Sequence, residues 1–370
     1  MTQQEVTRRF PTVGDGSGLV SGDSFSREEV QLALRNRGMP LEVLRYSITP
    51  AGLHYLLVHF DIPFVEVQDW NLSFGGLLSQ PFSLSLDEIR ARPARTLAVT
   101  MECAGNGRAL LSPRSISQPW LLEAVSTAEW TGTPLKPLLQ EAGLQDAATE
   151  ILFTGLDQGV QGEEVQYYQR SLSIADATQD EVLLAYEMNG RPLESQHGYP
   201  LRLIVPGWYG MTSVKWLDRI EAIDYQFDGY QMDRTYRYSQ SADDPGQPVE
   251  RIQVRSLMKP PGIPDFMTRG RLVDAGNLAV TGRAWAGRLG ISGVEFSEDG
   301  GESWSQTQLS EPVSAFAWRE WTFLWAARPG RHTLCVRATD SQGNTQPVEQ
   351  PWNYQGMGNN MVHRLEVLVE

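Results

Sequence analysis

The feature that most constrains the fold is a change in the pattern of apolar and turn-forming residues near residue 250. Beyond it, short apolar runs alternate with turn signals at a spacing of about ten residues, as in β-sandwich domains. The clearest runs are residues 278–285, 293–297 and 332–339, and turns follow two of them at 298–301 (EDGG) and 340–344 (DSQGN). The pattern predicts an all-β domain, for which an immunoglobulin-like sandwich is the simplest architecture.

The part before residue 250 mixes two periodicities. Residues 55–58, 96–99 and 202–205 are apolar runs typical of buried strands. Residues 119–125 and 135–141 are instead predicted as short helices. This mixture predicts an α+β domain.

Two stretches rich in Pro, Gly and Asp, at 241–248 and 259–264, are typical of a boundary between domains. With 370 residues and 41% hydrophobic content, the chain is long enough to bury two separate cores. We therefore predict a first domain over 1–245, in which 1–40 form an N-terminal extension, and a second domain over 246–370.

The formal net charge of −14 argues against nucleic acid or an anionic membrane as a partner of the whole molecule. Any anion site must then be a local cluster of basic residues. The N-terminus shows no apolar segment of the kind a secretory signal or a membrane span needs, although Arg8 and Arg9 form a twin-arginine pair. We expect a cytoplasmic protein, with a periplasmic one left open if the chain is a trimmed form.

The chain has only two cysteines, so a disulfide framework is not indicated and each cysteine needs its own explanation. Cys335 lies on an apolar alternation and is predicted to be a small core residue. Cys103 is different, because an apolar strand delivers it to a turn of Ala, Gly, Asn and Gly, followed by Arg108. That geometry suits a metal ligand or a nucleophile, and a buried cysteine at a strand end is the alternative.

A second concentration of polar residues follows downstream. His197, Arg202, Ser213 and Lys215 lie within 19 positions, interleaved with Gly and Pro. Any one of them alone is more often a surface residue, but together they predict a loop-rich pocket that presents several donors to a phosphate-like anion.

These segments resemble the sulfite oxidase and assimilatory nitrate reductase family. The similar stretches are ECAGNGR (102–108), STAEWTGTPL (126–135), LLAYEMNGRPLESQHGYPLR (183–202), PGWYGMTSVKWL (206–217), EFSEDGGESW (295–304) and WNYQGMGNNMVHRLEVLV (352–369). The resemblance leaves only the first 40 residues uncovered. It implies a molybdopterin-binding domain followed by a dimerisation domain, in a stand-alone member of bacterial type.

The resemblance also implies roles for particular residues. Cys103 matches the thiolate that binds molybdenum, and soft thiolate ligation suits such a metal. The residues that match pterin or phosphate contacts are His59 (in the HFDIP stretch), His197, Arg202, Ser213 and Lys215. Arg108 matches an arginine of the substrate pocket. Tyr236 is predicted as the active-site tyrosine, with Tyr238 as its competitor.

Two departures from the family pattern bear on the substrate. Leu57 stands two residues before His59, where sulfite oxidases have an arginine, and Gln355 stands where a second arginine is expected. Each missing charge-assisted contact to a dianion is worth roughly 1.5–3 kcal/mol. These two positions therefore bear on the substrate prediction and leave the cofactor prediction unchanged.

The resemblance implies oxygen-atom transfer on sulfite or a related small oxo compound, with electrons passed to an external acceptor of unknown identity. The chain has no CxxCH haem motif and no GxGxxG loop after a strand that would supply an internal acceptor. Three alternatives stay open: a sulfoxide-type reductase, a family member that binds the cofactor without turnover, and a binding module built on the sandwich.

We also expect a homodimer, because the family pairs its subunits through the second domain. Trp318, Trp321 and Trp325 are too closely spaced for one side of a strand. We interpret them as exposed aromatics of that subunit interface.

Overall fold

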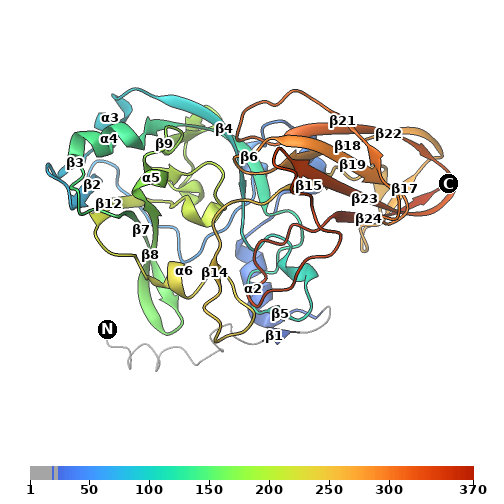
Figure 1. Cartoon of the computed structure of the whole chain (residues 1–370), viewed down its shortest axis with the longest axis horizontal. Coiled ribbons are helices and arrows are strands. Elements are labelled where there is room, and N and C mark those ends of the chain that lie inside the picture. The colour runs from blue at the N-terminus through green and yellow to red at the C-terminus, as the bar shows by residue number, and fades with distance from the viewer. Residues whose placement is uncertain (1–18, 21–23) are drawn as a thin grey trace.

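Two lobes lie side by side in the computed structural model, which describes residues 19–20 and 24–370 (Figure 1). The first lobe mixes helices and strands, whereas the regular elements of the second, from β15 onward, are all strands. The predicted fold class, an α+β domain followed by an all-β sandwich, is confirmed.

The first lobe is built on two five-stranded sheets. One sheet has the order β10-β9-β6-β4, with β11 also paired to β9, and consists of β4 Arg95–Glu102, β6 Val125–Pro134, β9 Leu183–Met188, β10 Arg191–Pro192 and β11 Arg202–Ile204. The other has the order β3-β2-β12-β7-β8 and consists of β2 Leu72–Gly76, β3 Phe82–Leu84, β7 Glu150–Gln161, β8 Glu164–Ser173 and β12 Leu217–Ile223. Two short pairs complete the lobe: β1 Leu19–Val20 with β5 Arg114–Ser115, and β13 Arg237–Tyr238 with β14 Gln247–Pro248.

Short helices connect these strands. The α-helices are α2 Arg27–Arg35, α3 Leu86–Arg90, α4 Leu135–Ala142, α5 Ile174–Ala177 and α6 Tyr230–Asp233. The 3-10 helices are η1 Leu41–Arg45, η2 Ala51–Leu53, η3 Arg108–Leu110, η4 Ser195–His197 and η5 Gly210–Thr212. Ser26 and Ser85 begin α2 and α3 with capping boxes, which satisfy backbone N–H groups that a helix start leaves without partners.

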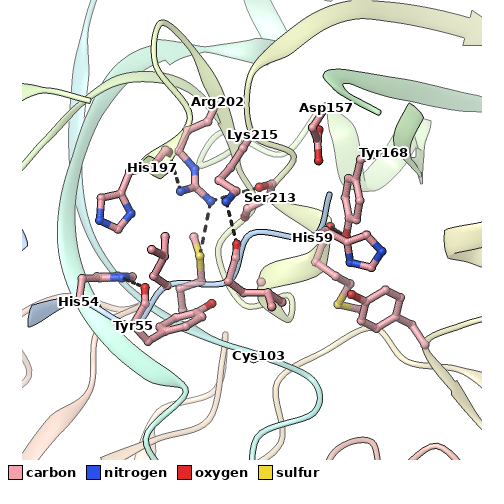
Figure 2. A pocket seen from close by; sticks show the side chains of 16 residues that line it. His54, Tyr55, His59, Cys103, Asp157, Tyr168, His197, Arg202, Ser213 and Lys215 are labelled. Atoms are coloured by element: carbon pink, nitrogen blue, oxygen red, sulfur yellow. Dashed lines mark hydrogen bonds between the residues drawn. The ribbon is translucent and has the colours of Figure 1, made fainter. Parts of the chain in front are cut away.

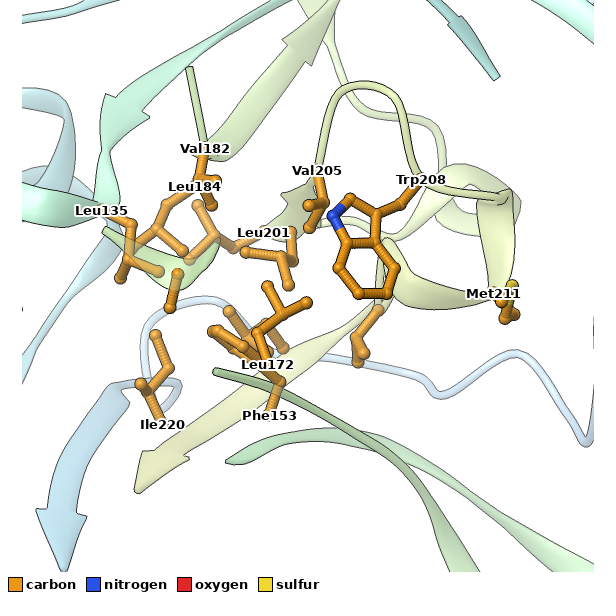
Figure 3. Close-up of a cluster of buried hydrophobic side chains, with 14 of the residues drawn as sticks. Leu135, Phe153, Leu172, Val182, Leu184, Leu201, Val205, Trp208, Met211 and Ile220 are labelled. Atoms are coloured by element: carbon orange, nitrogen blue, oxygen red, sulfur yellow. The ribbon is translucent and has the colours of Figure 1, made fainter. Parts of the chain in front are cut away.

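The main core of the first lobe fills the space between its two sheets (Figure 3). Leu184 of β9 approaches from one side, and Phe153 of β7 and Ile220 of β12 approach from the other. All three side chains are at most 1% exposed. Burying such side chains is worth about 1.5–3 kcal/mol each, so this layer fixes the loops that leave the strand ends.

The second lobe consists of a four-stranded sheet on a six-stranded sheet. The first, in the order β15-β18-β22-β21, consists of β15 Arg255–Met258, β18 Gly276–Trp285, β22 Arg319–Ala327 and β21 Gln308–Leu309. The second, in the order β16-β17-β24-β23-β19-β20, consists of β16 Ile263–Pro264, β17 Arg271–Val273, β24 His363–Val369, β23 Gly330–Asp340, β19 Ile291–Ser297 and β20 Ser305–Gln306. Cys335 of β23 is fully buried, in agreement with its prediction as a core residue.

The expectation that three tryptophans are exposed at a subunit interface is wrong. Trp321 and Trp325 are buried in the core between the two sandwich sheets, and they lie four positions apart on β22, where alternation places both on one face. Trp318 precedes the strand and packs near Trp285 at the boundary with the first lobe. The two directions, inward and toward the other lobe, explain the dense spacing.

Two local predictions are also wrong. Residues 55–58 form no strand: only Leu56 pairs, in a single bridge with Arg37. The helix predicted over 119–125 is absent: residues 119–124 have no helical backbone and Val125 begins β6. The backbone of this segment is used elsewhere, since the carbonyl of Ala124 accepts from Cys103 N–H at 2.9 Å. Backbone groups of both segments form hydrogen bonds with residues of the site described below: the carbonyl of Ala124 with Cys103 and the carbonyl of Leu57 with Lys215.

The boundary between the domains is apolar. Leu257, Trp285 and Trp318 from the sandwich side belong to the core of the first lobe. The predicted boundary at residues 245 and 246 stays a prediction.

Much of the predicted N-terminal extension 1–40 lies outside the described residues. Residues 1–18, which include Arg8 and Arg9, and residues 21–23 are not described. Among the described helices, none has the length and apolar character needed to cross a membrane.

Candidate active site

A pocket in the first lobe collects most of the predicted site residues. The predicted residues that line it are His59, Cys103, His197, Arg202, Ser213, Lys215 and Tyr236. They come from the end of β4, the segment before β2, the first residue of β11 and the loops on either side of it, and the loop before β13. Figure 2 shows Arg202 and Lys215 above the pocket and Cys103 below it. Segments separated by more than 100 positions thus meet at one place.

Cys103 lies directly after β4, at the start of the Gly-rich turn. Its N–H donates to the carbonyl of Ala124, and its own carbonyl accepts from Asn106 N–H at 2.9 Å. Gly107 has φ 92°, which a residue with a side chain adopts at a cost. Burial raises the pKa of the Cys103 thiol, while the charge of Arg108 opposes that rise. A bound metal cation would replace the thiol proton, since thiolate is the ligating form.

Arg202 and Lys215 supply positive charge to the pocket wall. Arg202 donates to the carbonyls of His197 (3.0 Å) and Ser213 (3.1 Å), and its Nε has no partner among the described residues. Lys215 donates to the carbonyl of Leu57 at 2.8 Å. These backbone bonds hold both cations in place before any ligand arrives.

The close approach of the two cations depends on one glycine. A Cβ at Gly198 would lie 3.1 Å from Cβ of Lys215 and 3.2 Å from Cβ of Arg202, and its φ is 104°. Burial lowers the pKa of Lys215, while the carboxylate of Asp157 acts in the opposite direction. An anionic ligand would restore full protonation of the lysine.

Two histidines meet on one side of the pocket, as Figure 2 shows. His54 and His197 are each 2% exposed, and their ring centroids lie 5.6 Å apart. The Nε2 atoms of both rings have no hydrogen-bond partner in the described part of the chain. Burial lowers the pKa of His54 to about 4 and that of His197 to about 2, so both are neutral at pH 7.

A second polar group lies on the opposite side, where Figure 2 shows His59, Asp157 and Tyr168. Nε2 of His59 lies 2.7 Å from Oε1 of Gln161. Asp157 is 3% exposed, and its Oδ1 has no partner within the described residues. Burial raises the pKa of this carboxyl group.

Of the two candidate tyrosines, Tyr236 lines the pocket and Tyr238 does not. Tyr236 has φ 59°, a strained backbone conformation of the kind that concentrates at functional sites. Burial raises the pKa of its phenol to about 12, so it stays protonated and able to donate. The hydroxyl of Tyr238 instead accepts a hydrogen bond from Gln253 at 3.1 Å.

Arg108 lies behind Cys103 and is not part of the pocket lining. Its guanidinium donates to the carbonyl of Gln355 (2.8 Å), the hydroxyl of Ser117 (2.8 Å) and the sulfur of Met357 (3.3 Å). The side chain therefore ties the Cys103 turn to the C-terminal segment. Its predicted contact with substrate stays a prediction.

The two positions that depart from the family pattern lie in different environments. Leu57 lines the pocket and gives it an apolar wall. The side chain of Gln355 is bonded away from the pocket lining, since it accepts from Arg237 N–H at 3.1 Å and donates to the carbonyl of Arg234 at 2.9 Å.

Sequence reasoning missed several lining residues, among them His54, Tyr55 and Asp157. The only signal for His54 was the rarity of histidine, with five in the chain. Nothing in the sequence marks Asp157, which stands inside an ordinary strand pattern. Its importance arises from burial, which the sequence does not display.

These groups fit a ligand with both soft and polar contacts. One cysteine can offer sulfur to a metal, Arg202 and Lys215 suit an anionic group, and the unpartnered nitrogens of His54 and His197 suit a ring with polar edges. Buried polar atoms without partners are costly, so a ligand that pairs them would stabilise the lobe. The described residues contain no cluster of three or more His, Cys, Asp or Glu suited to a metal. A single thiolate would therefore need help from a cofactor that brings its own ligands.

Comparisons with known proteins agree with this donor set. Residues 59–231 match the model of the oxidoreductase molybdopterin binding domain family, and residues 248–370 match that of the Mo-co oxidoreductase dimerisation domain family.

Among curated proteins, the chain is 33% identical over 359 residues to mitochondrial sulfite oxidase of Rattus norvegicus, covering 90% of this chain and 64% of that protein's length. It is 32% identical over 355 residues to sulfite oxidase of Arabidopsis thaliana, covering 86% and 87%. An NADH nitrate reductase of Solanum lycopersicum is 29% identical, covering 90% and 40%.

Among solved structures, the sulfane dehydrogenase SoxCD of Paracoccus pantotrophus superposes with a TM-score of 0.78 at 23% identity, covering 96% of this chain and 90% of that one. This likeness shows that the two proteins share a fold.

Proposed function

The chain belongs to the sulfite oxidase family of molybdenum-molybdopterin enzymes, and from that premise we propose that it transfers an oxygen atom to sulfite or a related small oxo compound. Electrons then leave to an external acceptor. The single observation that supports this most is Cys103 at the floor of a pocket whose walls carry Arg202 and Lys215.

Each group would have a distinct task. Cys103 would bind the metal through its thiolate, while Arg202, Lys215 and Ser213 hold the phosphate of the pterin. When bound, the molybdenum cofactor supplies two-electron oxygen-atom chemistry. The neutral rings of His54 and His197 would orient the pterin edge, because a pKa well below 7 leaves an acceptor nitrogen on each. Tyr236 would donate a hydrogen bond from its phenolic hydroxyl to an oxygen of the substrate.

The test is analysis of the purified protein for molybdenum and pterin, followed by steady-state assays with sulfite. We expect close to one metal and one pterin per chain, and turnover with an artificial electron acceptor. A full-length, folded protein that holds neither metal nor pterin would refute the proposal.

The environment of Cys103 supports weak rather than tight sulfite binding. Leu57 offers no charge, the side chain of Gln355 is bonded away from the pocket lining, and most donors of Arg108 are already used. Loss of two charge-assisted contacts of roughly 1.5–3 kcal/mol each would raise KM by several orders of magnitude. A neutral substrate such as a sulfoxide, reduced rather than oxidised, is the second candidate, because Leu57 would pack against it.

A double variant separates the two substrates. Leu57→Arg with Gln355→Arg should lower the KM for sulfite more than it changes kcat, because the new contacts hold substrate and transition state about equally. A parallel reductive assay with a sulfoxide uses the same metal-loaded sample. A KM for sulfite in the low micromolar range for the unaltered protein would show that these positions do not limit binding.

We further propose a homodimer formed through the matched dimerisation domain. The proposal rests on the family match, because the three tryptophans are buried and do not support it. Sedimentation at micromolar concentration should give twice the mass of one chain, and a single-chain mass would contradict the proposal. The cytoplasmic location stays a prediction, to be tested by cell fractionation.

A further inference from the structure

A buried ion pair joins the two lobes one residue before Cys103. Glu102 ends β4, which runs along the boundary between the lobes (Figure 1), and Arg255 begins β15. Nη1 of Arg255 donates to Oε1 of Glu102 at 2.7 Å, and the two side chains are 1% and 2% exposed. The indole Nε1 of Trp285 donates to the other oxygen at 2.8 Å. Two donors of the sandwich thus hold both oxygens of one carboxylate.

The register of the sandwich explains how one residue pair reaches one carboxylate. Arg255 and Trp285 are direct partners across the antiparallel strands β15 and β18. Side chains of directly opposed residues leave the same face of a sheet. Both therefore project toward the first lobe, although neither lines the pocket.

Glu102 is in turn tied to the turn that presents Cys103. Nδ2 of Asn106 donates to Oε1 of Glu102 at 3.0 Å, and Oδ1 of Asn106 accepts from Ala124 N–H at 3.1 Å. The N–H of Asn106 donates to the carbonyl of Cys103. Arg255 also donates to the carbonyl of Asn106 at 3.3 Å. Movement of Glu102 would therefore move the cysteine turn.

We propose that Arg255 and Trp285 are positioning residues for Cys103, through which the sandwich domain sets the geometry and the charge beside the metal. The inference rests on the proposed role of Cys103 as the metal ligand. A carboxylate in a low-dielectric interior acts strongly on a neighbouring charge, and the donors that compensate it set how strongly. The second lobe then contributes to the redox centre as well as to association of subunits.

The first test is Trp285→Phe in the molybdenum-loaded full chain. It keeps an aromatic ring and removes the N–H that donates to Oε2 of Glu102. We expect the thiolate-to-metal absorption band to shift and the reduction potential of the metal to fall, because less compensated negative charge disfavours an added electron. The matched control is Trp321→Phe on the neighbouring strand β22, since Trp321 is fully buried and its Nε1 has no partner in the described chain. Its band and potential should equal those of the natural protein.

A second variant covers the charges themselves. Glu102→Gln with Arg255→Met removes both at once, which a buried site tolerates better than loss of one partner. Of the two charges removed, the carboxylate of Glu102 acts on Cys103 and the guanidinium of Arg255 does not contribute. The reduction potential of the metal should therefore rise in the double variant, opposite in sign to the change in Trp285→Phe. Shifts of the same sign, or values equal to the Trp321→Phe control in both variants, would overturn the inference while leaving the proposed function intact. A natural protein without molybdenum would instead overturn the proposed function, and with it this inference.

Discussion

The wall of the cofactor pocket and the core of the sandwich are both buried, yet they satisfy their atoms differently. In the sandwich core, Trp325 donates to Glu298, and Phe296 stacks on Phe323 with centroids 4.5 Å apart. In the pocket, Nε2 of His54 and of His197 lack partners within the described structure. Among the described residues, the sandwich core leaves one polar side-chain atom without a partner, Nε1 of Trp321, whereas the pocket lining leaves several, which a bound ligand could pair.

The largest expected effect tests whether the pocket owes its chemistry to one residue. Cys103→Ser replaces a soft ligand with a poor hard one, so the protein should fold yet lose all turnover and the thiolate-to-metal absorption. Absorption spectra and assays measure both. Cys335→Ser is the control, because this cysteine is buried in the sandwich away from the pocket, and it should keep both properties. Retention of the absorption band in the Cys103 variant would show that another residue binds the metal.

The next effect tests how tightly the core of the sandwich is packed compared with the pocket wall. Trp321→Ala should lower the free energy of unfolding by about 3–5 kcal/mol, because a large buried ring leaves a cavity. Leu57→Ala in the pocket wall should cost clearly less, since its side chain already borders open space. Denaturant unfolding of the cofactor-free protein gives both values. Equal losses would mean that the pocket wall is packed as tightly as the core.

A smaller effect concerns affinity for the cofactor. Lys215→Met should weaken cofactor binding about 10- to 100-fold, in line with one charge-assisted contact of roughly 1.5–3 kcal/mol. Cofactor retention after dialysis is the measurement. Lys136→Met serves as the control, because Lys136 pairs with Asp180 on the surface, and its retention should equal that of the natural protein.

The smallest effect is a dependence of stability on pH. The folded-state pKa of His54 is lowered to about 4, from an ordinary value of 6.5. The unfolded chain therefore binds a proton first, and the cofactor-free protein should lose stability as pH falls from 6.5 toward 4, by up to about 1.4 kcal/mol per pH unit for this group. His54→Gln should flatten that slope. An unchanged slope would show that His54 is protonated in the folded state.

Local features of the fold could be predicted because they depend on neighbours in the chain. The strand that delivers Cys103, the helix over 135–141 and the strands of the sandwich all follow from periodicity and turn chemistry over a few residues. The helix predicted at 119–125 failed for the opposite reason. Its backbone groups bind a turn about 20 positions away, which no local pattern reveals.

The sequence by itself determined the fold class, the family and seven of the side chains that line the candidate site, because most of these seven stand close together in short motif segments. Tertiary structure alone decided which buried atoms lack partners, as for His54 and Asp157, and that Arg108 spends its donors on the C-terminal segment. It alone brought Arg255 and Trp285 to Glu102, across more than 150 positions. The reason is that burial and contact between distant strands result from the packing of whole sheets, whereas propensity and spacing act only along the chain.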